Sequence, residues 1–163
     1  MSFRSAITRH APSLQPDYVQ RPVGGPDAVF RFSVPVLRVR DVAATVAWYR
    51  NHLGFHAETF PERGANEFAI LERDGVQLLA RRTARPTREA HTGWDLYIWV
   101  DGADLRRLEA AMKLTGGIVR PLSALGETIA EIEIRDPDGY VLCIGGPTDA
   151  NRSSCVLREG DSR

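Results

Sequence analysis

One short run of the chain, Asp95 to Val100, alternates two kinds of side chain. Its odd positions are acidic or aromatic, namely Asp95, Tyr97 and Trp99, and its even positions are aliphatic. Successive side chains of a strand point to opposite faces of a sheet. We therefore expect the aliphatic row to pack under a helix, and the other row to hold a planar ligand against its rings. A carboxylate such as Asp95 would orient a polar group of that ligand.

Other predicted strands divide in the same way. In SVPVLRV and VQLLARR, one face is suited to packing and the other carries Val34, Val36, Arg38 and Leu79. For Arg38, a face wetted by solvent is an open alternative. The predicted ligand-binding residues are Val34, Val36, Arg38, Phe60, Leu79, Asp95, Tyr97, Trp99 and Cys143.

Residues of the types that catalyse reactions are present but not grouped by sequence. Glu131 and Glu133 share one face of a predicted strand and would act as acid or base if that face turned inward. The expected arrangement is instead a salt-bridged strand that faces solvent. Cys143 lies in an apolar strand with no histidine placed to activate it, so we expect it to pack. His91, in a charged linker, is expected to be solvated.

A strand–helix–strand–strand–strand order positions the first group of residues. Asp41 is the predicted N-cap of a helix with helical apolar spacing, and Gly54 is its predicted stop. The Asp74-Gly75 pair predicts a tight hairpin. The strands are expected at about 33–39, 55–60, 67–72 and 76–82.

The same order begins again after a charged, proline-containing linker at 85–93. Asp101 or Asp104 caps the second predicted helix, Gly116-Gly117 ends it, and Asp138-Gly139 closes the second hairpin. The strands are expected at 95–100, 118–122, 128–135 and 140–144.

Two similar halves explain this repeated order. The predicted fold class is α+β, with two βαβββ modules whose paired, curled mixed sheets enclose a cavity. Module one spans about residues 32–83 and module two about 94–146, within one domain at 30–146. We expect a flexible N-terminal extension at 1–28 and a polar C-terminal tail at 147–163.

Three segments carry a resemblance to a known family. They are VLRVRDVAATVAWYRNHLGF, ILERDGVQLL and IEIRDPDGYVLCI, in that order. The chain resembles the glyoxalase/bleomycin-resistance/dioxygenase group of the vicinal oxygen chelate superfamily over about residues 33 to 146. The resemblance implies paired βαβββ modules that curl into a cup, usually as a dimer. It also implies either a divalent metal or, in the drug-binding branch, a small ligand bound without one.

Metal-dependent members of this family place His or Gln on the first strand, Glu on the fourth, His on the fifth and Glu on the eighth. By the resemblance, these positions fall on Val34, Leu79, Asp95 and Cys143. That set offers at most two donors of unlike hardness, whereas a catalytic metal normally keeps three or more protein ligands. We therefore predict no cofactor and no divalent metal.

Charge and composition limit the classes of partner that we expect for this chain. The chain has 21 basic and 21 acidic residues among 163, which disfavours nucleic acid and anionic membranes as partners. No apolar run approaches the ~18 residues needed to span a bilayer, and no disulfide framework is suggested, so a cytoplasmic protein is expected. The basic first 16 residues also fit an organellar transit peptide, although a flexible tail is the simpler interpretation.

The leading hypothesis is a metal-free small-molecule binding protein, a homodimer that sequesters an aromatic or amphiphilic compound, with drug or toxin resistance as one use. The alternative is a lyase, isomerase or dioxygenase. It would use either a rearranged metal site around His91, Asp95 and Glu131 or metal-free acid–base catalysis. A third hypothesis is a domain kept for dimerisation or partner binding, whose hollow is filled by its own side chains.

Overall fold

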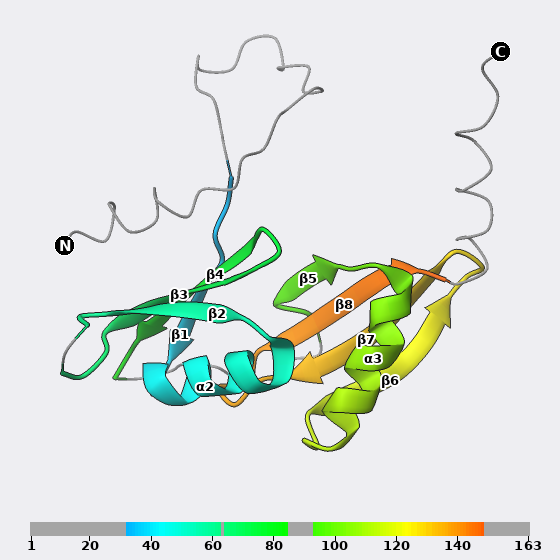
Figure 1. Ribbon diagram of the computed structural model, residues 1–163. Coiled ribbons are helices and arrows are strands. Elements are labelled where there is room, and N and C mark those ends of the chain that lie inside the picture. Colours follow the sequence, from blue (N-terminus) through cyan, green and yellow to red (C-terminus); the bar gives the residue numbers. More distant parts are fainter. Residues whose placement is uncertain (1–31, 63, 85–92, 149–163) are drawn as a thin grey trace, which may run out of the picture.

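The computed structural model describes residues 32–62, 64–84 and 93–148, which form two modules of one helix and one four-stranded sheet each (Figure 1). In module one the elements are β1 (Val36–Val39), α2 (Val42–Leu53), β2 (His56–Phe60), β3 (Phe68–Arg73) and β4 (Val76–Arg82). In module two they are β5 (Leu96–Trp99), α3 (Gly102–Lys113), β6 (Ile118–Leu125), β7 (Ile129–Arg135) and β8 (Val141–Pro147).

The two sheets have equivalent strand orders, β1-β4-β3-β2 and β5-β8-β7-β6. In each, the first strand pairs in parallel with the last, and the other pairs are antiparallel. The predicted α+β fold of two βαβββ modules is therefore confirmed. The predicted N-terminal extension and most of the C-terminal tail lie outside the described residues.

Local sequence signals explain the helix ends. The Asp41 carboxylate accepts hydrogen bonds from the backbone N–H groups of Ala43 and Ala44, and Gly54 ends α2 with a left-handed φ of 66°. Both predictions for α2 are confirmed. In contrast, α3 ends at Lys113, before the glycine pair predicted to stop it. The Thr115 hydroxyl donates to the carbonyl of Met112 there, which satisfies a group at the helix end.

The hairpin between β3 and β4 forms where the sequence predicts it. Asp74 and Gly75 both have positive φ, 51° and 83°, as the type I′ turn of a two-residue hairpin requires. This turn fixes the register of β3 on β4, in which Leu71 lies opposite Leu78 and Ile70 opposite Leu79. A shift of one residue would exchange the two faces of the sheet.

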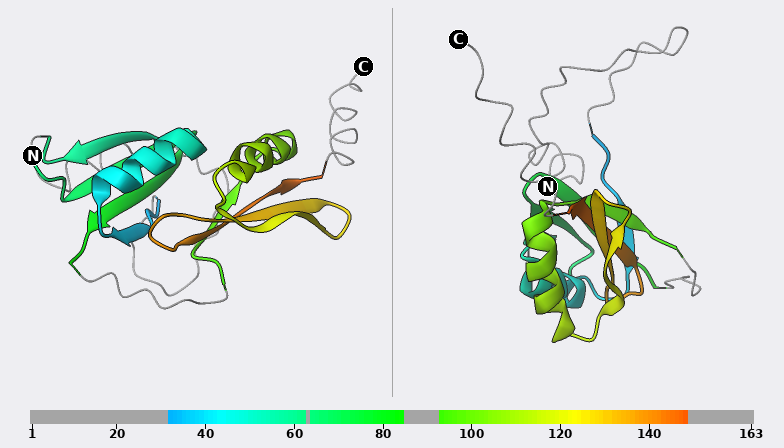
Figure 2. Two further views of the ribbon diagram at one scale, coloured as in Figure 1. Left: turned by 90° about the horizontal axis from the view of Figure 1, so that it is seen from below. Right: turned by 90° about the vertical axis from the view of Figure 1, so that its right-hand side faces the viewer.

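Both helices lie on the same side of the molecule, each over its own sheet (Figures 1 and 2). The main core fills the space between the helices and the sheets, and neither helix is long and apolar enough to cross a membrane. Its fully buried large side chains are Tyr49, Leu37, Leu71, Leu78, Leu105, Met112, Ile132, Ile134, Leu142, Val39 and Val42. The alternate residues of the strands consequently point to the side without helices.

The turn between β7 and β8 joins module two to module one. The buried Tyr49 hydroxyl on α2 donates to Asp136 at 3.1 Å, and the Thr45 hydroxyl donates to Asp138 at 2.7 Å. Burial raises the pKa of Asp136 to about 6. The Asp-Pro-Asp-Gly turn thus closes a hairpin and also holds the start of α2.

Candidate ligand-binding face

Three aromatic rings lie on the helix-free face of module two. Tyr97 and Trp99 of β5 are 45% and 55% exposed, and Trp94, just before the strand, is 48% exposed. The rings of Trp94 and Tyr97 are 5.5 Å apart between centroids. As predicted from the alternation, the aromatic row faces away from α3, whereas Leu96 on the other face is buried in the main core.

Tyr97 lies over β8 because the residue beneath it is a glycine. A Cβ atom added to Gly145 would come within 2.1 Å of the Tyr97 hydroxyl oxygen, a distance that no folded structure tolerates. The absence of a side chain at Gly145 therefore lets the phenol cross the strand. It reaches Glu131 on β7 and donates a hydrogen bond of 3.0 Å to that carboxylate.

Arg120 of β6 connects the two acidic residues of this face. Its guanidinium donates to Glu131 at 3.2 Å, to Glu133 at 2.9 Å and to the Ser123 hydroxyl at 2.7 Å. The Trp94 indole N–H also donates to Glu133, at 2.8 Å. All these donors hold the acidic pair against the sheet.

This network corrects one expectation. A solvent-facing position is wrong for Glu131, which is only 3% exposed, although the predicted salt bridging is present. The reason is that Arg120 folds over β7 and excludes water. The carboxylate is buried together with its cation, and so its negative charge is compensated.

The electrostatics of the network follow from its contacts. The hydrogen bond from Trp94, and then the hydrogen bond and positive charge of Arg120, lower the pKa of Glu133 in spite of some burial. Burial, and then the charges of Glu131 and Glu133, raise the pKa of the Cys143 thiol to about 11. Cys143 is fully buried and protonated near neutrality, which fits the expected packing role rather than a nucleophile.

The helix-free face of module one is filled differently. Phe60 and Phe68 stack with centroids 4.8 Å apart, and Ile70 and Leu79 pack with them into a small apolar cluster that Val34 also contacts. Phe60 and Leu79 are 8% and 2% exposed. These predicted ligand-binding residues form the floor of the face, while Val36, Arg38 and also Arg81 are exposed on it.

The predicted polar orienters lie in different settings. The Asp95 carboxylate accepts the backbone N–H of Val141 at 2.7 Å and so bonds the beginning of β5 to β8. The Arg38 side chain is exposed, and its backbone N–H donates to the hydroxyl of Tyr140. His91 lies outside the described residues. We expected Asp95 or Arg38 to orient a polar group of the ligand. Among the described residues, Arg120 is better placed for this role, because its guanidinium lies on the same face as the aromatic rings.

The residues at the family's metal positions do not fit a divalent metal. Val34 and Leu79 have no donor atom and pack in the same apolar cluster. Asp95 accepts a backbone bond, and the thiol of Cys143 is protonated. Among the described residues, no three His, Cys, Asp or Glu side chains gather in a way that could hold an ion. These four positions therefore offer a divalent ion too few donors.

Sequence reasoning missed three residues of this face. Arg120 lies within a predicted strand, 118–122, with no polar partner visible in sequence, and Trp94 belongs to no alternation pattern. Gly145 resembles an ordinary strand-end glycine. The pairing of β6 with β7 and of β7 with β8 brings these residues together, and register of that kind is not readable from a single strand.

Comparison with known proteins identifies the family. A model of the Glyoxalase/Bleomycin resistance protein/Dioxygenase superfamily matches residues 31–144. The chain belongs to this superfamily. The resemblance seen in the three sequence segments is thereby confirmed for the glyoxalase superfamily. No curated protein matches the chain.

Solved structures of the glyoxalase superfamily share the fold. TioX from Micromonospora sp. ML1 is 24% identical, with a TM-score of 0.59, covering 71% of this chain and 94% of its own. A glyoxylase/bleomycin resistance protein/dioxygenase domain from Frankia sp. EAN1pec is 23% identical, with a TM-score of 0.60, and covers 75% and 95%. The fosfomycin resistance protein from Listeria monocytogenes is 15% identical, with a TM-score of 0.61, and covers 77% and 99%. At these identities the likeness concerns the fold alone.

Proposed function

We propose that this chain is a metal-free small-molecule binding protein of the glyoxalase superfamily. It holds an aromatic or amphiphilic compound on the helix-free face of module two and acts in the cytoplasm, with drug or toxin sequestration as its use. The observation that carries the proposal is the group of three exposed rings, Trp94, Tyr97 and Trp99, above a buried ion-paired network. Monomeric surfaces rarely leave such rings uncovered without a partner.

The energetics suit reversible binding. Covering about 200 Å² of a planar compound contributes on the order of 5 kcal/mol, and ring contacts add about 1 to 3 kcal/mol. The cost of association then leaves a dissociation constant near micromolar. Arg120, Glu131 and Glu133 are already held by one another, so a ligand would meet a preorganised surface.

A single chain leaves this face open, since Tyr97 and Trp99 are about half exposed. The enclosure predicted for the cavity therefore calls for a second copy, and a homodimer is part of the proposal. The exposed Val36 of module one supplies apolar surface for the contact. Sedimentation equilibrium should show a dimer, and Val36→Glu should shift it toward monomer. A monomer at all concentrations would contradict this part.

Ligand binding is tested by tryptophan fluorescence with a panel of fused two-ring aromatic compounds. We expect saturable quenching at micromolar concentration and about a tenfold loss of affinity in Trp99→Ala, because that ring lies directly on the face. Trp48→Phe is the matched control, since Trp48 lies on α2 and packs beside Tyr49 on the helix side. Equal affinities in the two variants would refute the proposed face.

Metal content separates binding from the enzyme alternative. Protein purified without chelators should contain less than about 0.1 equivalent of zinc, nickel, manganese or iron, because the available donors are too few. Stoichiometric metal that is lost in Asp95→Ala would replace the proposal with a rearranged metal site. Asp41→Asn, which keeps a helix-capping side chain, is the control for a general loss of charge.

A further inference from the structure

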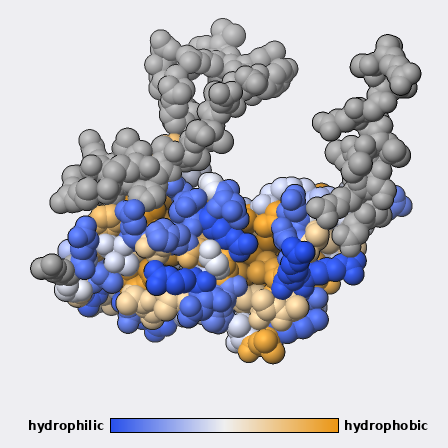
Figure 3. Space-filling model, viewed as in Figure 1, coloured by the Kyte–Doolittle hydropathy of each residue, from blue (hydrophilic) through white to orange (hydrophobic). Residues whose placement is uncertain are grey.

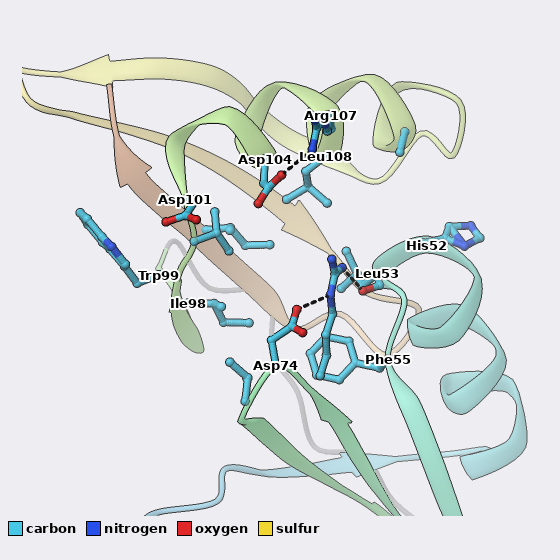
Figure 4. A pocket seen from close by; sticks show the side chains of 15 residues that line it. His52, Leu53, Phe55, Asp74, Ile98, Trp99, Asp101, Asp104, Arg107 and Leu108 are labelled. Carbon is cyan, nitrogen blue, oxygen red and sulfur yellow. Dashed lines mark hydrogen bonds and ion pairs between the residues drawn. The ribbon is translucent and has the colours of Figure 1, made fainter. Parts of the chain in front are cut away.

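A hollow lies on the side of the molecule opposite to the ligand-binding face, between the two modules. It has a volume of about 570 Å³ and is walled by α3 on one side and by the end of α2 and the β3–β4 turn on the other (Figure 4). Figure 3 shows apolar surface between the modules on this side, bordered by hydrophilic residues. We call this hollow the inter-module groove.

The inter-module groove is distinct from the ligand-binding face. Ile98 and Val100 contribute to the groove from β5 and the residue after it, and along the chain they alternate with Tyr97 and Trp99. Trp99 touches the rim, but its ring is directed away from the groove in Figure 4. A molecule in the groove would therefore lie on the other side of the sheet from the aromatic rings.

The interior of the groove is apolar and comes from both modules. Phe55 and Val76 belong to module one, and Ile98, Leu108 and Ile144 belong to module two. Phe55 and Ile144 are buried, while the other three are partly exposed toward the opening. Such a surface favours the hydrocarbon body of a small ligand.

The charged rim of the groove is not balanced. Two acidic side chains are already paired: Asp74 with Arg73 at 3.1 Å, and Asp104 with Arg107 at 3.1 Å. Arg73 also donates to the backbone carbonyl of Leu53. These two ion pairs cancel in formal charge.

Asp101 is the remaining acid of the rim. It stands at the start of α3, but its side chain makes no capping hydrogen bond, and among the described residues no ion pair holds it. The rim therefore carries one uncompensated negative charge. Since the two ion pairs are neutral overall, an anion would be repelled by the charge of Asp101, whereas a cation would meet a free carboxylate beside apolar surface.

We propose that the inter-module groove binds a small organic cation, an amine with an aliphatic or aromatic body, whose ammonium group pairs with Asp101. The body would lie against Ile98, Leu108 and Val76, so that the ligand contacts both modules at once. The volume suits a compound of roughly nine to twenty non-hydrogen atoms. This site is independent of the proposed function on the helix-free face.

The test uses three compounds of nearly the same shape with different charge: phenethylamine, 2-phenylethanol and 3-phenylpropionate. Binding to the full chain is measured at pH 8 by NMR, from the methyl shifts of the groove residues and the ring shifts of Trp94, Tyr97 and Trp99. We expect phenethylamine to bind at least fivefold more tightly than the alcohol, and the carboxylate to bind least. The preference should shrink as salt is raised from about 0.05 to 0.5 M.

Two substitutions should move the affinity for phenethylamine in opposite directions. Asp101→Asn should weaken it about fivefold, because the free charge is removed while asparagine remains acceptable at the helix start. Arg107→Met should strengthen it, because it releases the Asp104 carboxylate. Glu62→Gln is the control of equal charge change; Glu62 is exposed in the loop after β2, at the other end of β3 from the Asp74 turn.

The inference is overturned if the three compounds bind equally, or if phenethylamine does not bind at about 10 mM, a concentration at which even weak specific ligands bind. It is also overturned if the shifts that phenethylamine causes fall on Trp94, Tyr97 and Trp99. Tyr97→Ala, which changes a ring of the ligand-binding face that is not among the residues lining the groove, separates this result from that of the proposed function. It should weaken binding of the fused aromatic compounds and leave phenethylamine binding unchanged. A loss of both would mean that one site serves for both.

Discussion

The two modules place their strands in the same order but complete the helix-free face in opposite ways. In module one, Leu79 pairs with Val36 across the parallel strands and with Ile70 across the antiparallel ones. In module two, Cys143 occupies the place of Leu79, between Tyr97 and Glu133.

The next pair of residues on the same face shows the same contrast. Phe68 of β3 lies beside Arg81, whereas the equivalent Glu131 of β7 lies beside Gly145. An apolar side chain in module one is thus replaced by a carboxylate in module two, and a large side chain by none. The same backbone supports a small apolar core in one half and a polar, ion-paired surface in the other. The two modules thus share a fold, but the side chains on their helix-free faces differ in kind.

The largest change in stability that would test this comparison is expected in module one. Leu79→Ala should lower the free energy of unfolding by about 3 kcal/mol, because it opens a cavity in the apolar cluster. Cys143→Ala, at the equivalent place, should cost only about 1 kcal/mol, since a single sulfur atom is removed. Urea unfolding measures both. Equal costs would show that the two faces are supported alike.

The turns of the two hairpins also differ, because the carboxyl group of Asp136 in module two is buried and that of Asp74 in module one is exposed. Asp136 has a pKa of about 6 in the folded chain, raised from 3.8 by burial, so the native state binds its proton more tightly than the unfolded state. The stability that this proton confers is present below about pH 4 and is lost as pH rises through 6. Relative to the unsubstituted chain, Asp136→Asn should therefore be more stable at pH 7 than at pH 4 by about 2 to 3 kcal/mol.

The turn of module one supplies the control for this pH effect. The Asp74 side chain is 84% exposed, and it pairs with Arg73 in solvent. Asp74→Asn should change stability by less than about 0.5 kcal/mol at either pH. If Asp136→Asn behaves in the same way, the second hairpin does not hold a buried carboxyl group.

A smaller effect should follow from removal of the cation on the face of module two. Arg120→Met leaves the buried Glu131 without its partner and should cost about 2 kcal/mol at pH 7. The lowered pKa of Glu133 stabilises the fold above its usual range and ceases to do so as pH falls. The deficit should consequently shrink near pH 4. Arg81→Met, at an exposed arginine of module one, should change stability by less than about 0.5 kcal/mol.

The smallest stability effect is expected at Gly145. Gly145→Ala should displace the exposed Tyr97 ring at a cost below about 1 kcal/mol, while reducing affinity for the fused aromatic compounds about tenfold. Calorimetric titration and thermal unfolding measure the two quantities. Gly93→Ala is the control, because an added Cβ there meets no atom within 4 Å. Unchanged affinity in Gly145→Ala would remove Tyr97 from the site.

The fold was open to prediction because its signals are local. Asp41 and Gly54 mark the ends of α2, the Asp74-Gly75 pair specifies its turn, and the alternation in β5 assigns its faces. The chemistry of the site depends on contacts between strands. The burial of Glu131 follows from the reach of Arg120 across β6 and β7, at a place where the strand register shifts. No spacing within one strand contains that information.

The turn at Asp136 to Gly139 has a consequence for how the molecule is made. Its bonds to module one, including Tyr49 to Asp136 and Arg40 to Asp138, join residues 87 to 98 positions apart. Contacts between such distant residues form slowly, and chains are synthesised from the N-terminus. During synthesis on the ribosome, the hydroxyl groups of α2 can therefore bind the carboxylates of the turn only after nearly the whole of the described chain has been made.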